Sequence, residues 1–598
     1  MHLLIRRRDL DFLLYEWLDV AALCHHARFA QHDRTTFDAV IDAAETLAEE
    51  EFASHAAELD ANEPTFDGER VHLIPAVKKA LDAYIEGGFL GAAFDEADGG
   101  LQLPYTVGQT VNALFSAANI GTAGYPFLTG AAANLLKVVG SEAQQARYMR
   151  PMIAGRFFGT MCLSEPQAGS SLGDIRTRAI PQDDGSYHIK GSKMWISGGE
   201  HELAENIVHM VLARIDGAPA GTKGISLFVV PRSHVGDDGS VGARNDVRLV
   251  GLNHKMGYRG TVNTVLSFGD NDACVGYLVG EAGQGLAGMF HMMNEARIGV
   301  GMAAAQTAWF GYRYALSYAQ DRPQGRPAGA GSDSLQVPIV EHADVRRMLL
   351  AQKALSEGGM ALCFYAAELA DRIRLADAPS RSALEARLSL LTPIVKSWPS
   401  IWGQEVLSLG IQTLGGYGYT REYPLERLYR DNRLNEIHEG TTGIQSLDLL
   451  GRKVLSDGGK ALGALLQEMG ADADSAATAP ALAEFANALH AAASVLQKTS
   501  MALGAAAQQH GPAAAMTNSK VYLDLCGHVV LAWLWLRMAR TAQSALDQGT
   551  AATDESFYRG KIRACQYFFR WELPKIEAWA QLLQTLDGTC AEARPQEL

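Results

Sequence analysis

A glutamate beside a glycine is the residue in this sequence best placed to act as a base. Glu439 precedes Gly440 in the segment LNEIHEGTTGIQSLDLLGRKV, whose later apolar residues recur at helical spacing. Thr442 and Gln445 fit a T-x-x-Q capping box, which predicts a helix beginning near Thr442. A carboxylate on the turn before a helix can project into a cavity, where burial raises its pKa and strengthens it as a base. The alternative is a solvated acid stabilised by the helix dipole.

A loop in the middle of the chain could approach a flat or phosphorylated ligand. The segment MCLSEPQAGSSLGD begins at Met161, and its Pro and Gly residues exclude a helix interior. Gly169, Ser170 and Ser171 place small residues and hydroxyls on an exposed backbone. An ordinary surface loop has the same composition.

A second segment, KMWISGG, follows the loop. On a strand, Trp195 and Ser197 lie on the same face, because side chains two residues apart share a face. An aromatic ring with a nearby hydroxyl can pack against a flavin and hydrogen-bond to it. The alternative is a tryptophan of the hydrophobic core.

Composition narrows the class of protein. The chain has 598 residues, 47% of them apolar and 20% charged, which predicts a soluble protein of several domains. The formal net charge is -15, and the longest basic run is Arg6, Arg7 and Arg8. Nucleic acid is therefore not expected as a partner, because phosphate binding needs clustered Lys and Arg.

The cysteines and the apolar runs indicate where the protein works. Seven cysteines are scattered singly without a C-x-x-C, which predicts neither a metal site nor disulfides and fits a reducing cytoplasm. Asp9 and Asp11 interrupt the start of the chain, so no secretory signal is expected. The run VVLAWLWL from Val529 is too short to span a bilayer, so no membrane span is expected.

The periodicity of the chain predicts the elements that must position these residues. Helical spacing from about Asp38 to Arg156 gives way to short β-rich runs separated by Gly turns, then returns from Gly285 to Leu455 with a loop at Asp321–Ser334. After Lys460 the chain is Ala-rich and helical. The predicted domains are 1–160 (helical), 161–281 (β), 282–457 (helical bundle) and 458–598 (extra helical domain).

Five segments together resemble the acyl-CoA dehydrogenase family. SEPQAGS is similar to its first signature, KMWIS to its Lys-x-Trp-Ile-Ser strand and HKMGYRGT to its Lys-Met-Gly-x-Arg segment. LGIQTLGGYGYTREYPLERLYRD resembles its second signature, and IHEGTTGIQ the turn that carries its catalytic glutamate. The resemblance implies an α-helical N-terminal domain, a central antiparallel β domain and a helical-bundle domain. The extra C-terminal helices, with RDLDFLLYEWLDV and DRPQGR, resemble the long bacterial subgroup.

The resemblance also assigns roles to individual residues. Glu439 is the catalytic base, and Arg322 and Gln324 match a loop that reaches the FAD pyrophosphate of a neighbouring subunit. The substrate contacts are expected to be Ser170, Asn294, Arg297 and Gly440. The FAD contacts are expected to be Met161, Leu163, Ser164, Gly169, Ser170, Trp195, Ser197, Arg322, Gln324, Gln412, Gly416 and Thr441.

Two positions depart from the family pattern. Ser171 stands where Asp is usual, which leaves the local loop geometry open. His438 stands where Tyr is usual, directly before the base. A histidine titrates near neutrality, so it could couple to Glu439 or fill space.

The implied activity is FAD-dependent α,β-dehydrogenation of an acyl-CoA thioester, with medium- to long-chain fatty acyl-CoA as the expected substrate. Electrons are then expected to pass to an electron-transfer flavoprotein, and the extra helices favour a homodimer. Three alternatives stay open: a 3-methylmercaptopropionyl-CoA dehydrogenase, an acyl-CoA oxidase that uses dioxygen, and a non-catalytic scaffold on the same fold.

Overall fold

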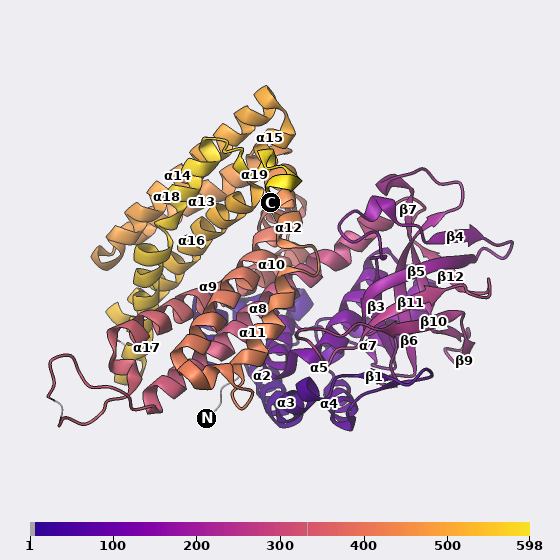
Figure 1. Ribbon diagram of the computed structural model, residues 1–598, viewed down its shortest axis with the longest axis horizontal. Helices are drawn as coiled ribbons and strands as arrows, with labels where there is room; N and C mark the ends of the chain where they lie inside the picture. The colour runs from indigo at the N-terminus through magenta and orange to yellow at the C-terminus, as the bar shows by residue number, and fades with distance from the viewer. Residues whose placement is uncertain (1–5, 332, 550) are drawn as a thin grey trace. The chain divides into compact units, whose positions relative to one another are not determined.

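The chain folds into two compact units, shown in the computed structural model of Figure 1. The structure describes residues 6–331, 333–549 and 551–598, without the side chains of 291–295 and 553. The sheet unit comprises residues 24–299, and the helical unit comprises residues 6–23 and 300–598. The helix α8 (Gly285–Asp321) contains the boundary between them.

Helices precede the sheet in the sheet unit. Phe37, Ile41 and Ala44 recur at helical spacing and form the buried face of α2. Asp33 caps this helix by accepting a hydrogen bond from the backbone N–H of Thr36 at 2.7 Å. The helices are α2 (Arg34–Leu47), α3 (Ala56–Ala61), α4 (Pro75–Glu86), α5 (Tyr105–Val139), α6 (Glu142–Gln144) and α7 (Arg150–Ile153).

An eight-stranded mixed sheet follows. Its order is β10-β11-β5-β12-β7-β6-β3, and β4 pairs with both β5 and β6. Most pairs are antiparallel, but β3 and β4 each run parallel to β6, which corrects the antiparallel prediction in this detail. The strands are β3 (Phe157–Cys162), β4 (Arg178–Pro181), β5 (Tyr187–Ser197), β6 (Asn206–Ile215), β7 (Ile225–Pro231), β10 (Val247–Leu252), β11 (Asn263–Phe268) and β12 (Val275–Val279).

The strand predictions from sequence are otherwise confirmed. The β-rich runs SYHIKGSKMWI, NIVHMVLARI, GISLFVVPR and TVNTVLSF, which the sequence pattern predicts as strands, coincide with β5, β6, β7 and β11 respectively. Two short hairpins lie outside the main sheet, β1 (Thr65–Phe66) with β2 (Val71–His72) and β8 (Ser233–Val235) with β9 (Val241–Arg244).

The core of the sheet unit lies between α5 and the sheet. Leu135 and Leu136 of α5 belong to one buried cluster with Val208 and Met210 of β6. The first eight residues of β6 are all buried, and the strand pairs with β7 on one side and with β3 and β4 on the other. This packing fixes β3, and with it the loop that begins at its end.

Long helices form the framework of the helical unit. Asp377 caps α10 by accepting from the backbone N–H of Ser380 at 3.1 Å. The helix contains Pro393 and Pro399, and it continues as a single element past both. The helices of the framework are the second part of α8, α9 (Ala343–Leu375), α10 (Ala378–Leu414), α11 (Leu425–Arg433) and α12 (Thr442–Leu447), which continues as a wider helix to Leu455.

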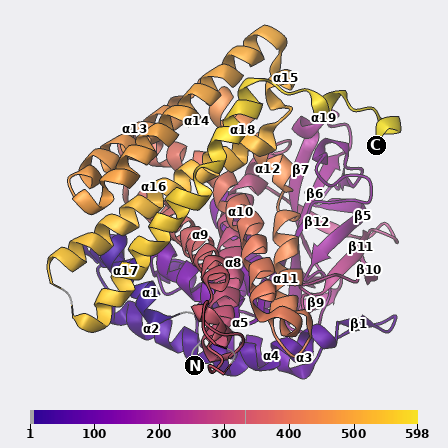
Figure 2. The same cartoon turned by 60° about the vertical axis from the view of Figure 1, so that its left-hand side comes forward.

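The chain after Lys460 adds further helices, several of which lie side by side in Figures 1 and 2. In the described part of the chain, only α16 (Ser519–Asp547) is long and apolar enough by composition to cross a membrane. Its most apolar window is 89% buried within the chain, as in the core helix of a soluble protein. These helices are α13 (Lys460–Ala477), α14 (Ala483–His510), α15 (Pro512–Met516), α16 (Ser519–Asp547), α17 (Ala552–Tyr567), α18 (Lys575–Gln584) and α19 (Thr589–Glu592).

The start of the chain packs into this same unit. The short helix α1 (Arg7–Asp11) carries Asp9, whose carboxylate accepts from Lys561 Nζ of α17 at 2.8 Å. Lys561 also donates to Glu357 of α9 at 2.9 Å, and all three side chains are almost fully buried. The N-terminal segment, the framework and the C-terminal helices therefore share one buried ion cluster.

Candidate functional site

The loop that begins at the end of β3 is fastened to β5. Lys193 Nζ donates to the carbonyl of Leu163 at 2.9 Å, and the backbone N–H of Met194 donates to the carbonyl of Ser164 at 3.0 Å. Met161 lies in β3 itself and is buried. The segments MCLSEPQAGSSLGD and KMWISGG are therefore brought together.

A buried ion pair reinforces this junction. The carboxylate of Glu165 lies 2.9 Å from Lys193 Nζ, and both side chains are essentially unexposed. The same carboxylate accepts from the backbone N–H groups of Arg176 and Thr177 at 2.6 and 3.0 Å. Burial acts to raise the pKa of Glu165, but the Lys193 charge and the hydrogen bonds lower it to about 2. Glu165 is therefore a fixed anion that organises the loop.

Trp195 is held in an unusual backbone conformation on β5. The strand has a bulge at Met194 and Trp195, where two residues oppose one residue of β11. The φ of Trp195 is 65°, in the left-handed region that side-chain-bearing residues rarely adopt. Its side chain is 57% exposed, whereas the next residue, Ile196, is buried. Trp195 is therefore not a residue of the hydrophobic core, and its strained backbone is typical of a ligand site.

Ser197 lies two residues further on. It is half-buried, and its Oγ accepts from Asn263 Nδ2 at 3.2 Å, which leaves its O–H to act as a donor. Since Ile196 between them is buried, the exposure pattern agrees with Trp195 and Ser197 sharing a face.

The remaining predicted residues of the sheet unit differ in exposure. Gly169 and Ser170 are exposed, and a Cβ built on Gly169 would meet nothing within 4 Å. Arg297, on the first part of α8, is buried. The side chain of Asn294 lies outside the described residues.

In the helical unit, Glu439 lies on a strained turn. Its φ is 53° and that of Gly440 is 87°, so two consecutive residues adopt positive φ. At Gly440 a Cβ would lie 2.7 Å from Gln445 Nε2, which explains why a residue without a side chain occupies this position. Glu439 is only partly exposed, so it is not the fully solvated acid of the alternative interpretation.

The helix after this turn begins at Thr442, as predicted, but the predicted cap was wrong. Thr441 is the N-cap, and its side chain accepts from the backbone N–H of Ile444 at 3.4 Å. Gln445 is not part of a capping box, because its Nε2 donates to the carbonyl of Glu439 at 2.9 Å. The glutamine therefore stabilises the turn that carries the predicted base.

His438 does not titrate near neutrality. Burial, with a smaller contribution from the charge of Lys396, lowers the pKa of His438 to about 3. Its Nε2 lies 3.2 Å from Asn435 Oδ1, a distance at which a neutral ring donates to the amide oxygen. Of the two roles left open, coupling to Glu439 and filling space, this environment favours the second, with His438 as a neutral ring beside the turn.

A third group of predicted residues lies on the loop after α8 and at the end of α10. The guanidinium of Arg322 lies 5.6 Å from the centre of the Tyr417 ring, next to Gly416. Arg322, Gln324, Gln412 and Gly416 are all exposed, and a Cβ on Gly416 would meet nothing within 4 Å. This surface can therefore receive a ligand or another subunit.

Comparison with known proteins decides the family. Four family models match in order: acyl-CoA dehydrogenase N-terminal domain at residues 35–156, middle domain at 160–270 and C-terminal domain at 283–455, then acetyl-CoA dehydrogenase C-terminal like at 465–594. The chain is 39% identical over 515 residues to the 3-methylmercaptopropionyl-CoA dehydrogenase of Ruegeria pomeroyi, covering 85% of each chain. It belongs to the acyl-CoA dehydrogenase family.

Two further comparisons extend over nearly the whole chain. The broad-specificity linear acyl-CoA dehydrogenase of Mycobacterium tuberculosis is 36% identical over 604 residues, 98% of each chain. The structure of a Bacillus anthracis acyl-CoA dehydrogenase complexed with FAD has the same fold, with a TM-score of 0.73, 21% identity and coverage of 95% of this chain and 90% of that one. The four-part architecture predicted from sequence is therefore confirmed.

As an acyl-CoA dehydrogenase, the protein is an FAD-dependent oxidoreductase, and its residues fit that cofactor. The exposed ring of Trp195 can face a flat heterocycle, and the Ser197 hydroxyl can donate to its polar edge. The open space beside Gly169 and Gly416 admits close approach of a ligand to the backbone. The individual contacts to FAD and CoA stay predictions.

Sequence reasoning missed three residues that support the candidate site. Glu165 and Lys193 stood inside quoted motifs but received no role. Lys396 of α10 was not singled out, although it is fully buried and its Nζ donates to the carbonyl of Gly440 at 2.8 Å. A lysine within an apolar helical stretch was the only available signal, because a fully buried lysine needs a partner.

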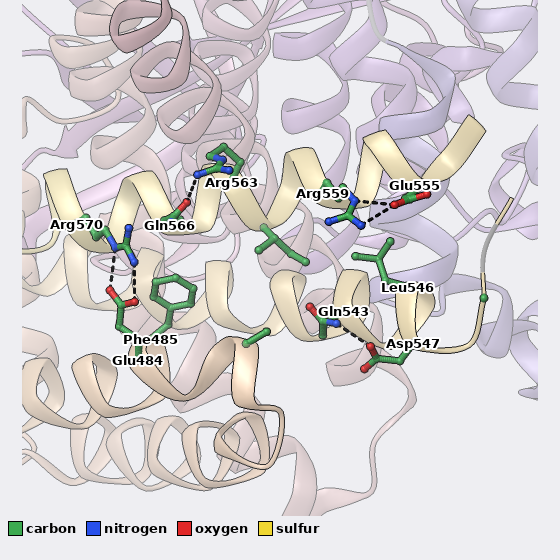
Figure 3. A pocket seen from close by; sticks show the side chains of 13 residues that line it. Glu484, Phe485, Gln543, Leu546, Asp547, Glu555, Arg559, Arg563, Gln566 and Arg570 are labelled. Carbon is green, nitrogen blue, oxygen red and sulfur yellow. Dashed lines mark hydrogen bonds and ion pairs between the residues drawn. The ribbon is translucent and has the colours of Figure 1, made fainter. Parts of the chain in front are cut away.

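Other features of the dehydrogenase lie apart from these residues. A pocket of about 700 Å³ lies among the C-terminal helices, and Glu484, Arg559, Arg563 and Arg570 are among the residues that line it (Figure 3). None of the predicted site residues lines it. Among the described residues, no group of three or more His, Cys, Asp or Glu is placed to hold a metal ion.

Proposed function

We propose that this enzyme oxidises linear acyl-CoA thioesters to trans-2-enoyl-CoA, with Glu439 as the catalytic base. The observation that carries the proposal is the Glu439 turn, which has two consecutive residues at positive φ and a side-chain donor on the Glu439 carbonyl. Such strain persists only where the surrounding structure holds it, which is common at catalytic residues. The motif match IHEGTTGIQ supports the same residue.

In the proposed reaction, the Glu439 carboxylate takes the proton from the α-carbon of the thioester. The electrons of that C–H bond form the α,β double bond as the β-hydrogen departs with its electron pair. FAD supplies the acceptor for this hydride when it is bound. Trp195 and Ser197 would orient the cofactor, and neutral His438 supports the turn through its contact with Asn435 Oδ1.

Medium- to long-chain fatty acyl-CoA is the proposed substrate class. The whole-length similarity to a broad-specificity linear acyl-CoA dehydrogenase supports a linear chain. The 39% identity to a 3-methylmercaptopropionyl-CoA dehydrogenase favours the second candidate, a short thioether substrate. Measuring kcat/KM for C4 to C16 acyl-CoAs and for 3-methylmercaptopropionyl-CoA, with a dye acceptor, distinguishes the two substrate classes. A clear preference for the thioether substrate would reject the medium- to long-chain fatty acyl-CoA class.

The proposed electron acceptor is an electron-transfer flavoprotein, and the proposed assembly is a homodimer in the cytoplasm. Exposed Arg322 and Gln324 support a surface that a second subunit can use. The oxidase alternative is tested by mixing substrate-reduced enzyme with air-saturated buffer. Slow reoxidation by air, with fast reoxidation by electron-transfer flavoprotein, supports the dehydrogenase. The reverse pattern supports the oxidase.

The decisive experiment replaces Glu439 by Gln, which keeps the shape and removes the basicity. Turnover should fall at least about a hundredfold, the scale of a lost general base, while FAD and acyl-CoA still bind. Glu436→Gln is the matched control, because Glu436 lies three residues earlier and pairs with Arg433 at 3.4 Å. If anaerobic stopped-flow bleaching by octanoyl-CoA stays at the wild-type rate in Glu439→Gln, another residue is the base.

A further inference from the structure

We infer that Lys396 is a positioning residue for the catalytic base, acting through the peptide that follows Glu439. The inference rests on the proposed role of Glu439 and adds the part of the fold that holds it. Lys396 lies in the middle of α10 with no exposed surface, and its Nζ donates to the carbonyl of Gly440 at 2.8 Å. Burying a lysine is costly, so its partner must matter to the fold or to the site.

The two hydrogen bonds at the turn fix two consecutive peptide planes. Gln445 Nε2 holds the carbonyl of Glu439, and Lys396 Nζ holds the carbonyl of Gly440. In a trans peptide the carbonyl and the N–H point in opposite directions. The two donors therefore set where the N–H groups of Gly440 and Thr441 point, and they hold the backbone of Glu439 in its left-handed conformation.

Helix α10, which carries Lys396, also holds the residue before Glu439 through a chain of side-chain hydrogen bonds. His438 Nε2 lies 3.2 Å from Asn435 Oδ1, and Asn435 Nδ2 donates to Asn432 Oδ1 at 3.2 Å. Asn432 Nδ2 donates in turn to the carbonyl of Ser400 on α10 at 3.1 Å. One turn of α10, from Lys396 to Ser400, thus contacts the chain on both sides of the base.

This turn of α10 is itself immobilised by neighbouring helices. At Gly301 of α8 a Cβ would lie 2.0 Å from the carbonyl oxygen of Val395, so the two backbones touch. On the other side, Trp398 packs against Gly527 of α16, where a Cβ would lie 2.6 Å from its ring. Lys396 therefore projects from a rigid platform, which is what precise placement of a base requires.

The test is a double-mutant cycle of Lys396→Met and Glu439→Gln, read by the limiting rate of anaerobic flavin bleaching with saturating octanoyl-CoA. Lys396→Met alone should slow bleaching roughly 10- to 100-fold, the scale of a misplaced catalytic group. The Kd of 2-octenoyl-CoA should stay within about twofold of wild type. In the Glu439→Gln background, Lys396→Met should change the rate by no more than about twofold, because the group it positions is already lost.

Lys453→Met is the matched control. Lys453 belongs to the same unit and donates to Ser389 Oγ at 2.7 Å, away from the turn, so its loss should leave bleaching at the wild-type rate. Gln445→Leu removes the other donor and should give the same non-additive pattern, which keeps the test usable if Lys396→Met folds poorly.

Each outcome bears on a different claim. Equal slowing by Lys396→Met in both backgrounds, or none in either, overturns the inference and leaves the role of Glu439 intact. Loss of FAD from both Lys396→Met and Gln445→Leu also overturns it, because the residues are then structural. A wild-type rate in Glu439→Gln alone rejects the proposed base itself.

Discussion

Glu165 and Lys193 lie 28 residues apart in sequence and form a 2.9 Å ion pair in the interior of the sheet unit. Each belongs to a different family motif, and neither faces solvent. The pair joins the loop of Leu163 and Ser164 to the strand of Trp195, so one electrostatic contact aligns two predicted flavin segments.

Lys193→Met should destabilise the protein by about 3–5 kcal/mol, because it leaves Glu165 charged and buried without its partner. Chemical unfolding of the sheet unit, followed by tryptophan fluorescence, measures the loss. Glu205→Gln is the control, since its pair with Arg156 is solvent-exposed and should contribute no more than about 1 kcal/mol. Equal losses in the two variants would contradict the assignment.

The same pair predicts a pH dependence of stability. The pKa of Glu165 is lowered from 4.5 to about 2 in the folded state, so its contribution is complete above about pH 4.5 and is lost as the pH falls towards 2. Glu165→Gln should remove this part of the acid sensitivity. The free energy of unfolding, measured from pH 6 to pH 2.5 in both proteins, checks the prediction; parallel curves would refute it.

Trp195→Ala should weaken FAD binding at least about tenfold, because the exposed ring is lost as a stacking surface. The free energy of unfolding of the FAD-free protein should change by no more than about 0.5 kcal/mol, as for a surface residue. Trp571→Ala is a matched control, since Trp571 is also 57% exposed. The Kd for FAD of both apoproteins is measured by flavin fluorescence titration. Equal Kd values in the Trp195→Ala and Trp571→Ala variants would show that the Trp195 ring does not contact the cofactor.

If Arg322 serves the FAD of a neighbouring subunit, hybrid dimers should recover activity. Arg322→Ala and Glu439→Gln homodimers are each expected to be nearly inactive. In a hybrid, one site combines the intact Glu439 of one chain with the intact Arg322 of the other and should work. Co-expression with two affinity tags isolates the hybrid, and light scattering checks its size. If the hybrid is no more active than the two parent homodimers, Arg322 contributes to the FAD site of its own chain or to none.

Lys561→Met should unfold or strongly destabilise the helical unit, by about 3–5 kcal/mol, because Asp9 and Glu357 would remain as buried carboxylates. Thermal unfolding measures this, with exposed Lys460→Met as the control. An unchanged melting temperature would mean that contacts other than this ion cluster hold the N-terminal segment.

The sequence was sufficient wherever a property is local. Helical spacing and Gly-rich turns placed the β-rich segment between helical ones, and the T-T-G-I-Q run placed a helix start at Thr442. It placed the cap at Thr442 instead of Thr441, because both side chains can accept a hydrogen bond and only the backbone conformation decides which one does. The parallel pairing of β3 with β6 was likewise hidden, since alternation along a strand does not encode its neighbour.

Tertiary structure alone decided which residues support the candidate site. Lys396 and Gly440 are 44 residues apart, and nothing near either of them in the sequence indicates the contact. Trp195 could have been core or ligand surface until the bulge in β5 and its exposure were known. The motifs specify which groups can do chemistry, because that depends on residue type. Their partners depend on how distant helices and strands pack, because a buried charge or a strained turn is stabilised only by what the fold brings beside it.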